Sequence, residues 1–150
     1  MTAYRHILLT ADFSEYGDAI ACRAKSLADA FQAKLSILHV LDNIQMPDTA
    51  YGTVIPVDTP SKYDLLEAER VKLIALGQEV GTDSNNLWLI WGVPKEEIVR
   101  LAETISADLI VVGSHGRHGL AMLLGSTANG VLHHAKCDLL AIRIPDAAEI

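Results

Sequence analysis

The chain has 150 residues, of which half are apolar and 21% are charged, and its formal net charge at pH 7 is −7. This length predicts one globular domain over residues 1–150, with a core that needs no disulfide or structural metal. The negative charge argues against nucleic acid and anionic membranes as partners, because both attract basic surfaces. No apolar run is long enough to span a bilayer and no signal-peptide pattern is present, so a cytoplasmic location is expected.

Strand-like and helix-like segments alternate along the chain. Short apolar runs typical of buried strands occupy residues 6–11, 35–40, 87–91, 107–112 and 139–144. Segments with apolar residues at helical spacing occupy residues 14–31, 61–80, 94–105 and 126–134. Ser14 is expected to cap the first helix, Pro94 to open the third and Gly81 to follow the second. The alternation predicts an α/β fold in which helices cover both faces of one five-stranded parallel sheet.

The polar stretch 42–60 contains three prolines and is expected to be a long loop. Long loops in compact domains often have a function. Cys22 and Cys137 lie in or beside apolar runs, so both are expected to be reduced structural residues. His133, His134 and Cys137 have metal-binding side chains, but adjacent residues on a helix point about 100° apart, so no metal site is expected.

The segment most indicative of function follows the fourth strand. Residues 113–119 read GSHGRHG, and Gly125, Ser126 and Thr127 come where the fourth helix is expected to begin. Glycines let the backbone approach a ligand, and amides and hydroxyls at a helix start bind anions. Ligands of such sheets bind at the carboxyl ends of the strands, where the strand order reverses.

Asp12 follows the first strand and would face the glycine segment if the first and fourth strands are neighbours. A carboxylate there accepts hydrogen bonds from ribose hydroxyls while the glycine segment takes phosphates, so an adenine nucleotide is the natural ligand. Two other interpretations remain open. Asp12 can simply cap the first helix, and the glycines can form only a tight turn.

The whole chain resembles the UspA superfamily of universal stress proteins. The resemblance rests on segment 7–14, on LHV at 38–40, on WGVP at 91–94, on DLIVVGSHG at 108–116 and on the ending 131–143. It implies the strand order 3-2-1-4-5 and, commonly, a homodimer through the fifth strands. The strand residues concerned are Leu139, Leu140, Ala141, Ile142, Arg143 and Ile144.

The resemblance also implies a site for ATP, which Mg²⁺ can accompany. The acid after the first strand, here Asp12, contacts the ribose or adenine region, and the backbone at Val40 bonds to adenine. The phosphates are held by the pattern Gly-x2-Gly-x9-Gly-(Ser/Thr). The residues expected to bind the cofactor are Asp12, Val40, Gly113, His115, Gly116, Arg117, Gly125, Ser126 and Thr127.

One departure from the family pattern decides between two hypotheses about function. Only eight residues separate Gly116 from Gly125, where the family pattern has nine. The first hypothesis is a stress protein regulated by bound ATP. The alternative is a dimeric interaction protein whose glycine loop is vestigial or binds an anion. No visible partner orients His115 or His118 for acid–base catalysis, so we expect no enzyme, or at most slow ATP hydrolysis.

Overall fold

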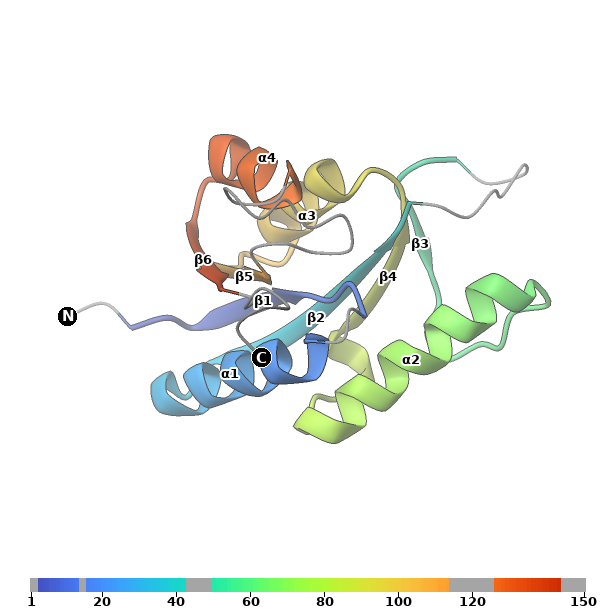
Figure 1. Cartoon of the computed structure of the whole chain (residues 1–150), viewed down its shortest axis with the longest axis horizontal. Coiled ribbons are helices and arrows are strands. Elements are labelled where there is room, and N and C mark those ends of the chain that lie inside the picture. The colour runs from blue at the N-terminus through green and yellow to red at the C-terminus, as the bar shows by residue number, and fades with distance from the viewer. Residues whose placement is uncertain (1–2, 14–15, 43–49, 114–125, 144–150) are drawn as a thin grey trace, which may run out of the picture.

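The computed structural model describes residues 3–13, 16–42, 50–113 and 126–143 (Figure 1). Strands and helices alternate along most of the chain, as predicted. The strands are β1 (His6–Thr10), β2 (Lys34–Leu41), β3 (Thr53–Ile55), β4 (Leu87–Trp91), β5 (Leu109–Gly113) and β6 (Asp138–Ile142). The α-helices are α1 (Gly17–Phe31), α2 (Asp64–Val80), α3 (Pro94–Thr104) and α4 (Ser126–His134), and a short 3₁₀ turn, Ser84–Asn86, precedes β4.

The strands form one sheet in the order β3-β4-β2-β1-β5-β6. Five of them are parallel, and their order is the expected 3-2-1-4-5. The expected number of five strands is wrong, because β3 adds a sixth, antiparallel to β4, inside the stretch 42–60 that was expected to be loop. With only three residues, β3 is too short to show alternation in the sequence. Its pairing with β4 defines it as a strand.

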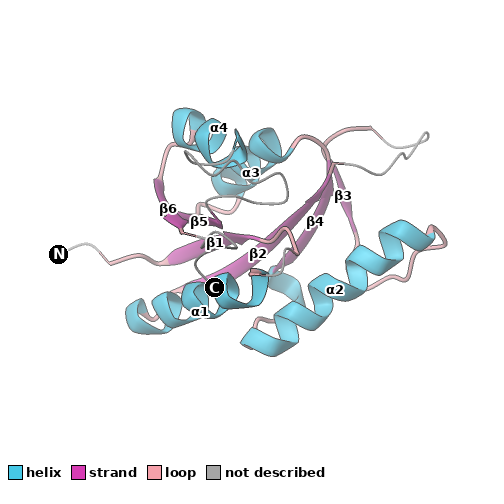
Figure 2. Cartoon of the chain, in the orientation of Figure 1, coloured by secondary structure: helices cyan, strands magenta, loops and turns pink. Residues whose placement is uncertain are grey.

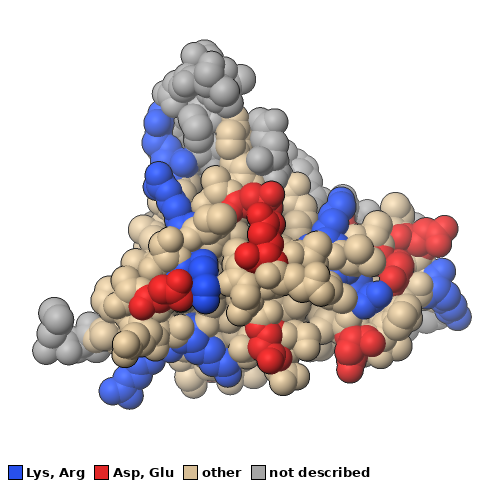
Figure 3. Space-filling model, turned by 90° about the horizontal axis from the view of Figure 1, so that it is seen from below, with Lys and Arg blue, Asp and Glu red and all other residues tan. Residues whose placement is uncertain are grey.

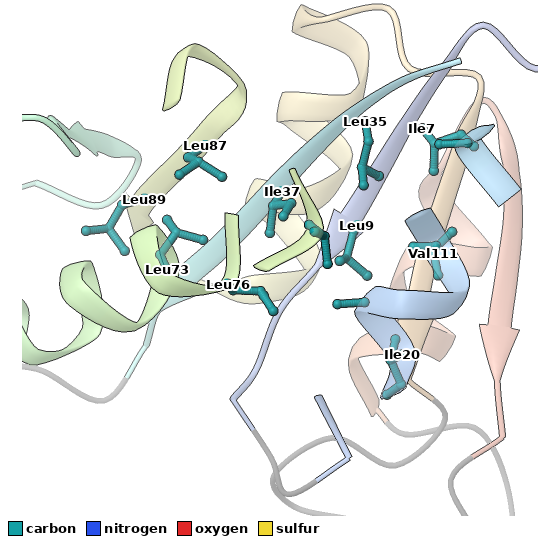
Figure 4. Packing of buried hydrophobic residues seen from close by; sticks show 14 of the residues in the cluster. Ile7, Leu9, Ile20, Leu35, Ile37, Leu73, Leu76, Leu87, Leu89 and Val111 are labelled. Atoms are coloured by element: carbon teal, nitrogen blue, oxygen red, sulfur yellow. The ribbon is translucent and has the colours of Figure 1, made fainter. Parts of the chain in front are cut away.

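Helices cover both faces of the sheet, with α1 and α2 on one side and α3 and α4 on the other (Figure 2). Alternate residues of a strand point to opposite faces. Accordingly Ile7 and Leu9 of β1 pack in the cluster beneath α1 and α2, whereas Leu8 packs beneath α3 and α4. Figure 4 shows how the first cluster brings side chains of β1, β2, β4 and β5 against the two helices. Burying each large aliphatic side chain contributes about 1.5–3 kcal/mol.

Two helices begin later than the sequence predicted. Tyr16 precedes α1, so the helix does not start after Ser14, which lies outside the described residues. Before α2, the Ser61 hydroxyl accepts a hydrogen bond from the amide of Tyr63 (3.1 Å) and forms a local turn. Such side-chain bonds compete with helix formation, which delays the start of α2. Gly81 ends α2 at a φ of +74°, as expected of a glycine there.

The cysteines are only partly as expected. Both are free thiols, and Cys137 is partly buried. Cys22, however, is exposed on α1, so it is not a packed structural residue. Burial raises the pKa of the Cys137 thiol, with Asp138 and Asp108 adding to the effect.

Acidic and basic side chains are interspersed on the face that α1 and α2 form (Figure 3). Lys25 and Asp29 of α1, for example, pair at 3.1 Å. Within the residues that the structure describes, no helix is long and apolar enough to cross a membrane.

Candidate functional site

The carboxyl ends of the parallel strands lie along one edge of the sheet, here called the carboxyl edge. The strand order reverses between β1 and β5, because the chain leaves β1 toward β2 and later returns to β5 on the other side. Leu9 of β1 pairs with Val111 of β5. Asp12, two residues after β1, and Gly113, the last residue of β5, therefore lie at the carboxyl ends of two adjacent strands at the reversal point. The condition for the predicted proximity, that these two strands are neighbours, is confirmed, whereas the glycine segment beyond Gly113 lies outside the described residues.

The backbone just before Asp12 is held from both neighbouring strands. The amide of Ala11 donates to the carbonyl of Leu38 (2.8 Å), and the carbonyl of Ala11 accepts from Nδ1 of His39 (2.7 Å). On the β5 side, the hydroxyl of Thr10 donates to the carbonyl of Val111 (3.3 Å). These bonds fix the direction in which the chain leaves the sheet at Asp12.

Phe13, directly after Asp12, adopts a φ of +57°. A bulky residue in this left-handed region is uncommon, and such conformations cluster at functional sites. Its ring packs 4.5 Å from the ring of His39. Asp12 itself is partly exposed and has interactions of its own. The junction after β1 therefore presents a carboxylate on a locally constrained backbone.

Val40 lies at the same edge, two residues beyond the pair that Leu38 makes with Thr10. Its side chain is 8% exposed and packs in the core beneath α3 and α4. Its backbone pairs with Ile90 of β4. The side chain of Val40 is therefore occupied in the core, so any contact with a ligand would have to come from its backbone.

On the β5 side, Gly113 ends the strand and is partly exposed. The helix α4 begins at Ser126, as predicted, and Thr127 lies in its first turn, partly buried. Only residues 135–137 join the end of α4 to the start of β6, which places the last turn of α4 near the amino ends of the strands. The first turn of α4 therefore lies toward the carboxyl edge. The remaining expected ligands, His115, Gly116, Arg117 and Gly125, lie outside the described residues, as does His118.

Helix α4 packs closely on α3 at Gly130. A Cβ there would lie 2.8 Å from Cδ of Lys95, so a larger residue would force the helices apart. Pro94 opens α3, as predicted, directly beyond the carboxyl end of β4. The first turn of α3 therefore also lies at the carboxyl edge.

A buried carboxylate that sequence reasoning missed lies beside β4. Glu97 of α3 is 2% exposed, and both its oxygens accept from Nη1 of Arg100. A Cβ on Gly92 would come within 2.7 Å of this carboxylate. Gly52, at a φ of +91°, lies against Arg100 and donates its amide to the carbonyl of Trp91 (2.6 Å). These contacts hold the start of β3 over the end of β4.

A second missed residue, Glu69 of α2, approaches His39 from the helix side. Its Oε2 lies 3.6 Å from Nε2 of His39. One signal in the sequence was available: Glu69 falls between Leu66 and Leu73 on the apolar stripe of α2, where a charged residue is unusual. Glu97 likewise interrupts the stripe of α3. The expectation that His39 is packed and hydrogen-bonded is confirmed.

The histidines of α4 do not form a metal site with the cysteine that follows them. His133 and His134 are both exposed. Across the described ranges, no group of three His, Cys, Asp or Glu residues is arranged to hold a metal ion.

Comparisons with known proteins agree with the motifs. A sequence model of the universal stress protein family matches residues 3–143. The chain is 38% identical over 141 residues to universal stress protein A homolog 1 of Coxiella burnetii, which covers 93% of this chain and 96% of that protein.

Two solved structures are similar across almost the same span. One is universal stress protein UspA from Lactobacillus plantarum, with a TM-score of 0.68 and 29% identity, covering 95% of this chain and 100% of the other. The second is a universal stress protein in complex with cAMP, with a TM-score of 0.62 and 26% identity, covering 96% and 100%.

Proposed function

Because the chain belongs to the universal stress protein family, we propose that it binds an adenine nucleotide, ATP with Mg²⁺, as a regulatory ligand. The observation that carries the proposal is the placement of Asp12 and Gly113 on adjacent strand ends where the strand order reverses. A relative of the same fold has been solved with cAMP, which supports an adenine nucleotide as the ligand class.

The residues at this edge fit a nucleotide. The partly exposed Asp12 can accept hydrogen bonds from ribose hydroxyls, and the backbone of Val40 can contact the base. Gly113 has no side chain to block a phosphate. Thr127 in the first turn of α4 offers a hydroxyl and lies near the positive end of the helix dipole.

In this proposal the remaining phosphate contacts come from the segment after β5. Backbone amides at Gly116 and Gly125 approach the phosphates, Ser126 contributes a hydroxyl, and His115 and Arg117 contribute donors. Bound Mg²⁺ would neutralise phosphate charge. We further propose that the nucleotide acts as a signal in the cytoplasm and that turnover, if any, is slow.

We also propose that the protein forms a homodimer through β6, the edge strand of the sheet. Leu140 of β6 and Leu132 of α4 are large apolar side chains left exposed. Exposed apolar edge strands favour pairing with another chain. Leu140→Asp should therefore give a monomer in sedimentation velocity. Ile142 is unsuitable for this test, because it is 7% exposed and packs in the core beneath α1 and α2.

Calorimetric titration with ATP and Mg²⁺ tests the nucleotide proposal, after mass spectrometry has shown that the protein is free of nucleotide. We expect saturable binding in the micromolar range. Gly116→Val should abolish it by placing a side chain where the phosphates lie. Gly17→Ala is the control, because a Cβ at Gly17 meets no atom within 4 Å.

The absence of binding at millimolar ATP would contradict the proposal. It would favour the alternative of a dimeric interaction protein, and the eight-residue spacing between Gly116 and Gly125 would then be the reason.

A further inference from the structure

Alternate side chains of β2 face α1 and α2, because residues two apart on a strand share a face. Leu35, Ile37 and Leu41 are the apolar members of this row and belong to the core beneath the two helices. The fourth member is His39, which is 2% exposed. Its Nδ1 lies 2.7 Å from the carbonyl oxygen of Ala11. A carbonyl oxygen only accepts, so Nδ1 carries the hydrogen and donates it.

Glu69 faces the other nitrogen of the ring. Its Oε2 lies 3.6 Å from Nε2 of His39 and 3.9 Å from Nζ of Lys72. This oxygen is buried, yet it makes no hydrogen bond to any residue that the structure describes. A buried carboxylate oxygen is unfavourable unless positive charge compensates it. Since the carbonyl of Ala11 already takes the Nδ1 hydrogen, a second proton on Nε2 makes the contact with Glu69 favourable.

The same helix also reaches the residue after Asp12. The ring of Phe13 lies against the ring of His39, and Nζ of Lys72 lies 5.9 Å from the centre of the Phe13 ring. Phe13 keeps its φ of +57° only while its surroundings hold it there. The residues on both sides of Asp12 are therefore anchored to His39, and His39 in turn faces Glu69.

We propose that Glu69 is a positioning residue for Asp12. It orients and charges the imidazole of His39, which fixes the carbonyl of Ala11 before the carboxylate and packs against Phe13 after it. The position of α2 thus sets the position of the carboxylate that receives the ribose. The inference rests on the nucleotide site proposed above. Because coupling is reciprocal, bound nucleotide should in turn strengthen the contact between Glu69 and His39.

A double-mutant cycle on ATP affinity tests this role. Glu69→Gln keeps the shape of the side chain and removes its charge, and we expect about fivefold weaker ATP binding. Glu79→Gln, at an exposed position of the same helix, is the matched control and should change affinity by less than about twofold. In the Asp12→Ala background, Glu69→Gln should cause no further loss. An equal loss in both backgrounds would overturn the proposal.

The state of the imidazole gives a readout that a merely structural role would not move. Nitrogen NMR at pH 7, with the His39 signals assigned through His39→Asn, should show protons on both ring nitrogens of the wild type. In Glu69→Gln only Nδ1 should carry one. A ring with the same protonation in both proteins would contradict the role of Glu69. Thermal unfolding checks that each variant is folded.

Failure of the nucleotide proposal remains distinguishable from failure of this one. If the wild-type protein binds no ATP, the amide signals of Ala11 and Phe13 decide instead. Glu69→Gln should shift both signals, whereas Glu79→Gln should shift neither. Unchanged amide and imidazole signals in Glu69→Gln would show that α2 does not position this junction.

Discussion

At the amino edge of the sheet, where the parallel strands begin, polar side chains meet their partners over short distances. The carboxylate of Asp108 accepts from the amides of Arg5 (2.9 Å) and His6 (3.0 Å). The imidazole of His6 bridges the carbonyl of Ile105 (3.1 Å) and the hydroxyl of Ser36 (2.7 Å). Each of these bonds joins segments that are far apart in the sequence, so the amino edge ties the layers of the fold together.

The carboxyl edge is arranged differently. Oε2 of Glu69 is buried with no hydrogen bond to the described residues. Gly92 leaves room for the carboxylate of Glu97, and Gly113 ends β5 without a side chain. A buried polar atom without a hydrogen bond is uncommon in a folded protein and is a reason to look for a function nearby. We therefore expect substitutions at the amino edge to change stability and substitutions at the carboxyl edge to change the proposed nucleotide binding.

Of the substitutions that test this difference between the edges, Asp108→Ala is expected to have the largest effect on the free energy of unfolding. The amides of Arg5 and His6 would lose their acceptor, so the free energy of unfolding should fall by about 2 kcal/mol. ATP affinity should stay unchanged, because the proposed nucleotide site lies at the opposite edge. Urea unfolding and calorimetry measure the two quantities. Asp29→Ala, at an exposed position of α1, is the control, and a large loss of ATP affinity in Asp108→Ala would contradict the separation.

Asp12→Ala should show the opposite pattern. Loss of the carboxylate should weaken ATP binding about tenfold, which corresponds to about 1.4 kcal/mol, while the unfolding free energy stays within about 0.5 kcal/mol. Asp12→Asn keeps one acceptor oxygen, so its ATP affinity should lie between those of the wild type and Asp12→Ala. Destabilisation of Asp12→Ala without loss of affinity would show instead that Asp12 has only a structural role.

Acid should weaken the ion pair between Glu67 and Arg70 on α2, which contributes to stability away from both edges. The guanidinium of Arg70 beside Glu67 lowers the pKa of that carboxyl from its ordinary 4.5 to about 2. The unfolded chain therefore binds the proton first, and the stabilising effect of the pair is lost as the pH falls from about 4.5 toward 2. Glu67→Gln should unfold with a flatter pH dependence over this range in urea titrations. Identical slopes for the two proteins would rule out this contribution.

The smallest effect is expected from His6. Burial lowers the pKa of its imidazole below the ordinary 6.5, so the folded protein favours the neutral ring. The stability contribution is complete above pH 6.5 and declines as the pH falls through the lowered pKa. His6→Asn should lack this decline when unfolding is compared at pH 7.5 and 5.5. Equal declines in both proteins would assign the effect to other groups.

The sequence predicted the local features of the site well. The end of β1 before Asp12, the first turn of α4 at Ser126 and the opening of α3 at Pro94 all lie where the pattern placed them. Each depends on periodicity or a boundary residue within a few positions. The start of α1 was predicted too early, because Tyr16 still lies before the first helical residue, Gly17, and the apolar spacing did not mark that boundary.

The periodic pattern of the sequence by itself determined the alternating elements and the two-sided burial. These follow from spacing along the chain, since a period near 2 or 3.6 fixes which face of a strand or helix is apolar. Only the tertiary structure decided that β3 joins β4, that Glu69 faces His39 and that Asp108 caps the amides beside β1. Those contacts join residues distant in sequence, and they form because the packed layers bring side chains together that no local pattern relates.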